Sequence, residues 1–71
     1  MTHLSRVRAE CIEQDDTKEE VVHKVYATIN GIRYQRELVA KCPIDAIDIA
    51  RSTPIVIGKY WHEVERPTRH T

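Results

Sequence analysis

Four histidines and two cysteines are the residues of this chain whose chemistry could hold a metal ion. Zinc sites use such residues in pairs at short spacings, such as Cys-x2-Cys or His-x3-His. No pair in this sequence has either spacing, and the residues concerned are His3, Cys11, His23, Cys42, His62 and His70. We therefore expect no metal centre and no other cofactor.

Catalytic groups are equally sparse in the sequence. With only two glycines, the chain has no glycine-rich phosphate loop, and it has no Gly-x-Ser-x-Gly motif. Asp45 and Asp48 have the spacing of a solvent-exposed helix face. Cys42-Pro43 matches the end of the bacterial iron–sulfur motif, but the other cysteines that this motif needs are missing. The sequence predicts a protein that is not an enzyme.

The size of the chain indicates one small domain. It has 71 residues and a mass of 8.3 kDa, so we expect a single domain over residues 1–71 with frayed tails at 1–3 and 67–71. Eleven Lys and Arg are balanced by eleven Asp and Glu. Proteins that coat nucleic acids carry a basic excess that neutralises phosphates. The charge balance therefore argues against direct nucleic-acid binding.

The expected location is the cytoplasm. No apolar run approaches the roughly 18 residues that a membrane-spanning helix needs, and no secretory leader is recognisable. Cys11 and Cys42 are too few for the disulfide framework of a small secreted domain. Free thiols are the favoured interpretation, and a single disulfide between the two cysteines is the alternative.

Residues 21–40 carry the clearest structural pattern, a β-hairpin. Two alternating segments flank Asn30-Gly31, the pair that tolerates the positive φ angles of a type I′ turn. A two-residue loop sets the strand register, which pairs Ile29 with Ile32, Ala27 with Tyr34, Val25 with Arg36 and Lys24 with Glu37. We expect the core-facing side to carry Val21, Val25, Ala27, Ile29, Ile32, Tyr34 and Leu38. The opposite side should face water or a partner.

The other elements follow from shorter patterns. Residues 5–13 alternate as in a strand, although their apolar spacing also fits a helix. Pro43 suits the first turn of a helix over 43–51, whose apolar face would carry Ile44, Ala46, Ile47, Ile49 and Ala50. Residues 55–66 predict either one strand bent at Gly58 or a short buried strand followed by an edge strand.

These elements predict an α+β fold in the order β-β-β-α-β. Seven Val and eight Ile against two Leu favour a sheet, and one helix packed across one face would leave the other face exposed and polar. On that exposed face, Tyr26, Arg33 and Trp61 are residue types common in binding hot spots. Whether Trp61 is a contact or a core residue is left open. Asp15 and Asp16, in a polar turn over 14–20, form a second candidate patch.

The order of elements resembles a family of small podophage proteins that inhibit host bacterial RNA polymerase. The resemblance covers residues 24–67 and rests on Tyr26-Ala27-Thr28-Ile29, Ala40, Asp45-Ala46-Ile47-Asp48-Ile49-Ala50 and Arg66-Pro67. In that family an arginine of the last strand contacts the polymerase, and Arg66 is the matching position. A second family arginine, two residues earlier, is replaced here by Val64.

The expected function is therefore that of a non-enzymatic phage or prophage protein. It would bind a host protein complex, with RNA polymerase favoured, and block it sterically. Arg66, Arg33, Tyr26, Trp61, Asp15 and Asp16 are the candidate contacts. The alternatives are an anti-CRISPR-type protein that binds a Cas effector and a small nucleic-acid-binding module. Self-association through an unpaired strand edge is compatible with each of these.

Overall fold

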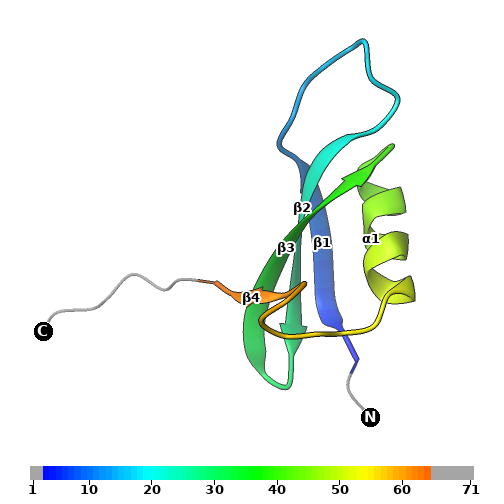
Figure 1. Ribbon diagram of the computed structural model, residues 1–71. Helices are drawn as coiled ribbons and strands as arrows, with labels where there is room; N and C mark the ends of the chain where they lie inside the picture. The colour runs from blue at the N-terminus through cyan, green and yellow to red at the C-terminus, as the bar shows by residue number, and fades with distance from the viewer. Residues whose placement is uncertain (1–2, 65–71) are drawn as a thin grey trace, which may run out of the picture.

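The computed structural model describes residues 3–64 and has the predicted α+β architecture (Figure 1). Its elements are β1 (Ser5–Cys11), β2 (Val21–Ile29), β3 (Ile32–Ala40), α1 (Pro43–Ser52) and β4 (His62–Glu63). The strands form one antiparallel sheet in the order β1-β2-β3-β4, and α1 packs on β1, β2 and β3. Arg66 and the predicted tails, apart from His3, lie outside the described residues.

The β2–β3 hairpin has the predicted turn and register. Asn30 and Gly31 have φ angles of 52° and 82°, as a type I′ turn requires. The pairs Ile29–Ile32, Ala27–Tyr34, Val25–Arg36 and Lys24–Glu37 are all present. One departure is Ile32, which was expected in the core but is 38% exposed, although Ile29 directly opposite is fully buried.

The first segment is a strand, which decides between the two predicted alternatives. β1 runs antiparallel to β2 and pairs Arg8 with Tyr26 and Glu10 with Lys24. The register shifts between Ser5 and Arg8, and Arg6 within this bulge has a φ of 51°. A bulge of this kind bends the strand locally and redirects its side chains.

The helix begins as predicted, at Pro43. Cys42 caps the helix, because its Sγ accepts a hydrogen bond from the Asp45 N–H at 3.4 Å. Ala46 and Ala50 are fully buried, which lets α1 approach the sheet closely. The expectation that Ile44 lies on the apolar face is wrong, because Ile44 is 73% exposed. It lies two residues, about 200° of helical rotation, from Ala46.

The core lies between α1 and the sheet and holds eight buried apolar residues. They are Val25, Ala27, Ile29, Tyr34, Ala40, Ala46, Ala50 and Trp61. His23 is also buried, on the core-facing side of β2, and its Nδ1 lies 2.8 Å from the Val21 carbonyl oxygen.

The segment after α1 is mostly a loop, and neither of the two predicted arrangements forms in full. No short buried strand forms at 55–57, where Ile57 is 50% exposed. Instead, the Val56 carbonyl accepts hydrogen bonds from the N–H groups of Lys59, Tyr60 and Trp61. Gly58, with a φ of 90°, makes this tight turn possible. The predicted edge strand is present as β4, where His62 and Glu63 pair with Gln35 and Tyr34 of β3. The Val64 N–H adds a hydrogen bond to the Arg33 carbonyl oxygen at 3.0 Å.

Candidate functional site

The face of the sheet turned away from α1, called here the open face, is the candidate site. Antiparallel partners point to the same side of a sheet, so the registers place polar residues from three strands on it. They are Arg8 and Glu10 from β1, Lys24, Tyr26 and Thr28 from β2, and Arg33, Gln35 and Glu37 from β3. The prediction that one hairpin face is buried and the other faces solvent is confirmed, and the open face also carries the apolar pair Val22 and Val39.

Three arginines gather at one end of the open face, next to the hairpin turn. Arg6, Arg8 and Arg33, called here the arginine cluster, line a shallow hollow together with Thr28 and Gly31. All three arginines are exposed, and no acidic side chain among residues 3–64 lines this hollow. Guanidinium groups donate paired N–H bonds to carboxylates and phosphates, so the hollow suits an anionic group of a partner.

Tyr26 is held in place by side chains of β1. The Arg8 guanidinium carbon lies 4.6 Å from the centre of the Tyr26 ring, a cation–π geometry. The Tyr26 hydroxyl donates a hydrogen bond to Glu10 Oε1 at 3.2 Å. Because Arg8 covers the ring, Tyr26 orients Arg8 within the arginine cluster and offers little open surface for stacking.

Trp61 belongs to the core and not to the open face. It is fully buried, so its candidate role as a surface contact is wrong. The turn at Gly58 directs the Trp61 side chain inward, beneath Arg36. The Arg36 guanidinium carbon lies 5.6 Å from the centre of the indole ring. A cation–π contact of this kind stabilises the inward orientation.

Arg36 joins this loop to α1. Its Nη1 donates a hydrogen bond to Thr53 Oγ1 at 2.9 Å, and its guanidinium also lies over the Tyr60 ring. Burial lowers the pKa of Arg36, and the nearby Tyr60 hydroxyl opposes this effect. Arg36 Nε and Trp61 Nε1 are buried without a hydrogen-bond partner among residues 3–64. The group is a packing centre, and it lies away from the arginine cluster.

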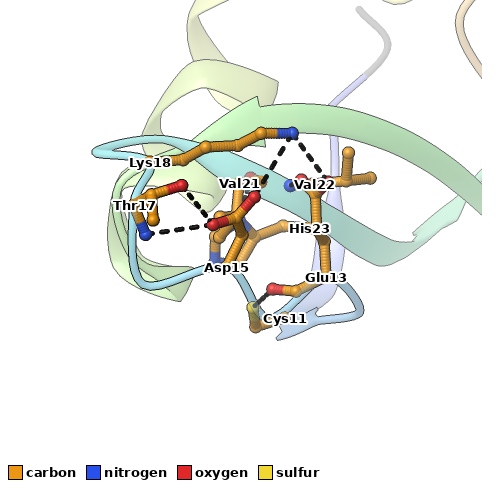
Figure 2. Close-up of polar contacts among 8 residues, drawn as sticks. All are labelled: Cys11, Glu13, Asp15, Thr17, Lys18, Val21, Val22 and His23. Carbon is orange, nitrogen blue, oxygen red and sulfur yellow. Dashed lines mark hydrogen bonds and ion pairs between the residues drawn. The ribbon is translucent and has the colours of Figure 1, made fainter.

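The acidic loop between β1 and β2 is held by its own contacts (Figure 2). Asp15 Oδ1 accepts hydrogen bonds from the N–H and the hydroxyl of Thr17, and these two bonds lower the pKa of Asp15. Glu13 Oε1 accepts the Val22 N–H at 3.0 Å, and Glu13 Oε2 lies 3.0 Å from Lys18 Nζ. The backbone bond first, and then the lysine, lower the pKa of Glu13.

The candidate contacts are therefore split between two ends of the molecule. Tyr26 and Arg33 lie on the open face, whereas Asp15 and Asp16 lie on the β1–β2 loop at the far end of β2 (Figure 1). The length of β2 separates the two ends by roughly 25 Å, at about 3.3 Å per residue. Asp15 is occupied within its loop, while Asp16 is exposed.

Arg6 and Arg8 are site residues that the sequence reasoning missed. Their signal was present, because alternation of residues 5–13 places them opposite Val7 and Ala9. The alternation alone does not predict which strand lies beside residues 5–13. Pairing of β1 with β2 is what brings Arg8 beside Tyr26 and completes the cluster.

Other site chemistries find little support in the part of the chain that is described. Residues 3–64 contain no group of three or more His, Cys, Asp or Glu side chains close enough to hold a metal ion. No helix among them has the length and apolar character to cross a membrane. Comparison with known proteins gives no matching family model, no similar curated protein and no similar solved structure.

Proposed function

We propose that this protein is a non-enzymatic inhibitor whose open face binds an acidic surface of a partner protein complex. The observation that supports it is the arginine cluster, because three exposed guanidinium groups line one hollow in which none of the described lining residues is acidic. Arginine is enriched in binding hot spots, where it forms paired hydrogen bonds with carboxylates. Steric occlusion of the partner needs no catalytic group.

The partner we propose is a host bacterial RNA polymerase, and the protein is then a phage or prophage product acting in the bacterial cytoplasm. The support is the resemblance in sequence and element order over residues 24–67, including Arg66 at the position of a family contact. Arg33 and Arg66 are accordingly the proposed contacts from the second half of the chain.

A nucleic-acid partner is the weaker candidate, although phosphates also suit an arginine cluster. Nucleic-acid-binding sheets stack bases on uncovered aromatic rings within a broadly basic surface. Here Arg8 covers Tyr26, and the formal net charge is zero. The geometry therefore favours a protein surface that carries carboxylates.

The test is binding of the full chain to purified bacterial RNA polymerase, measured by surface plasmon resonance with nuclease-treated protein. We expect Arg33→Glu and Arg6→Glu each to weaken binding at least tenfold, since each substitution reverses a charge in the hollow. Arg51→Glu is the matched control, because it makes the same charge change at an exposed position on α1. It should leave affinity within about twofold.

Inhibition should follow binding in a transcription assay with the same variants. Equal inhibition by the wild type and by Arg33→Glu would contradict the role of the open face. No binding to polymerase would reject that partner, and a purified Cas effector and a salt-titrated gel shift with RNA and DNA would then test the two alternatives. Arg66→Ala, measured in the same binding assay, tests whether Arg66 is a contact, as the family resemblance implies.

A further inference from the structure

The two edges of the sheet differ in how much backbone they leave unpaired. Within residues 3–64, no strand pairs with the outer edge of β1 along its length. The outer edge of β3 is partly closed, because β4 pairs with Tyr34 and Gln35. At the far end of that edge, the Lys41 N–H already donates to Asp45 Oδ2 at 3.2 Å. The β1 edge is therefore the longer free edge.

Hydrogen-bond alternation shows which β1 residues are available at this edge. The Ile12 N–H donates to the Val22 carbonyl oxygen at 3.1 Å. In an antiparallel ladder, hydrogen-bonded and non-hydrogen-bonded pairs alternate, so Arg8 and Glu10 direct their backbone groups toward β2. Val7, Ala9 and Cys11 consequently direct theirs outward, away from the sheet.

The charges along β1 are complementary to a second copy of the same strand. Two β1 strands can pair antiparallel about Ala9. Val7 of one copy then lies opposite Cys11 of the other, and the two Ala9 residues lie opposite each other. The outward backbone groups of the two strands face each other in this arrangement. Arg8 of each copy then lies directly opposite Glu10 of the other. Opposite charges in directly facing positions stabilise a strand pair.

Neighbouring registers are disfavoured by the same charges. The nearest alternative registers shift one β1 strand by two residues along the other. Such a shift keeps the outward backbone groups paired and the side chains on the same faces, and it centres the pairing on Arg8 or on Glu10. The first sets Arg8 against Arg8, and the second sets Glu10 against Glu10. Like charges directly opposite destabilise a strand pair, so among these three registers only the one centred on Ala9 satisfies backbone and side chains together.

We infer that this protein forms a symmetric dimer in which the β1 strands of two copies pair antiparallel about Ala9. The two sheets join into one continuous sheet, with both helices on one side and both open faces on the other. The bulge at Arg6 bends the strand at one end and limits the pairing to Val7–Cys11. The inference does not depend on the identity of any partner complex.

The first measurement is the molecular mass of the full chain by sedimentation equilibrium between about 1 and 500 µM under reducing conditions. We expect the mass to rise with concentration from 8.3 kDa to about twice that value. A mass that stays monomeric over this range would overturn the inference.

Charge exchange tests the register. Arg8→Glu alone and Glu10→Arg alone each place two pairs of like charges across the interface, and each should raise the dimer dissociation constant at least tenfold. The double variant, Arg8→Glu with Glu10→Arg, restores opposite charges and should return the constant to within about threefold of wild type. Circular dichroism verifies that each variant is folded. If the folded double variant does not regain the wild-type dissociation constant, the proposed register is wrong.

Proline substitutions identify the edge. Ala9→Pro removes an outward N–H of β1 and should abolish the dimer, while Val39→Pro removes an outward N–H of β3 and should leave it intact. The reverse pattern would overturn the inference in favour of the β3 edge. Thermal melting of each variant at a concentration where it is monomeric controls for loss of the fold.

Discussion

Trp61 is the largest side chain in a very small core, and the fold depends on it. Truncation of a buried Trp to Ala costs about 3–5 kcal/mol, and a domain of this size has a net stability of about 3–5 kcal/mol. We therefore expect Trp61→Ala to be mostly unfolded at 25 °C, as measured by far-ultraviolet circular dichroism with urea titration. Ile44→Ala is the control, since Ile44 is 73% exposed and its loss should shift stability by less than about 0.5 kcal/mol. A folded Trp61→Ala variant would contradict the placement of Trp61 in the core.

Glu13 links the acidic loop to β2 through a carboxylate whose pKa is lowered on folding. Its acceptor bond from the Val22 N–H is the first cause, and Lys18 adds to it. A lowered folded-state pKa means that the stabilisation is present above the ordinary value of 4.5 and is lost as pH falls through the folded-state pKa. We expect the wild-type melting temperature to fall below pH 4.5 more steeply than that of Glu13→Gln.

The matched control for this pH dependence is Glu19→Gln. Glu19 belongs to the same loop and is exposed. Its removal should leave the slope of melting temperature against pH close to that of the wild type. If Glu13→Gln and Glu19→Gln give the same slope as the wild type, the hydrogen bond to Val22 does not contribute to acid sensitivity.

The helix is positioned by the small size of two residues rather than by its isoleucines alone. Ala46 and Ala50 are fully buried against the sheet, so a larger side chain there must push α1 away. Overpacking of this kind typically costs about 1–3 kcal/mol, and we expect Ala50→Leu to lower the free energy of unfolding by that amount in a urea titration. Ile44→Glu, on the exposed side, should change it by less than about 0.5 kcal/mol. Equal effects of the two variants would contradict the observed orientation of the helix.

Local chemistry explains which elements were predictable. The two-residue turn at Asn30-Gly31 determines the register of β2 and β3, because a loop of this length fixes which residues face each other. Pro43 marks the start of α1. The bulge at Arg6 was not predictable, since an arginine carries no preference for positive φ. The strand expected at residues 55–57 did not form, for a related reason. Ile55 and Ile57 have β-strand propensity, but the Gly58 turn leaves no edge for them to join.

The candidate site was predictable only in part. Tyr26 and Arg33 were placed on the open face because the hairpin register is local. Trp61 could not be assigned to a face from alternation, since its orientation depends on the tertiary contact with Arg36. Arg6 and Arg8 required knowledge of which strand lies beside β1, and that neighbour is set by the packing of the whole sheet.

The molecule as a whole is electrically polar even though its formal net charge is zero. The arginine cluster lies beside the hairpin turn, and the acidic loop lies at the other end of β2 (Figure 1). Their separation of roughly 25 Å exceeds the Debye length of about 10 Å at 0.1 M salt. The two ends therefore act almost independently on an approaching partner.

This polarity predicts how association with an acidic partner depends on salt. Charged surfaces steer association, and screening removes that steering, so the association rate with RNA polymerase should fall at least tenfold between about 0.05 and 0.5 M salt. Arg33→Glu should flatten this dependence, measured by stopped-flow fluorescence with labelled protein. Asp16→Asn, which changes the distant loop, should leave the slope unchanged. A flatter slope for Asp16→Asn than for Arg33→Glu would instead make the acidic loop the steering surface and a basic surface its target.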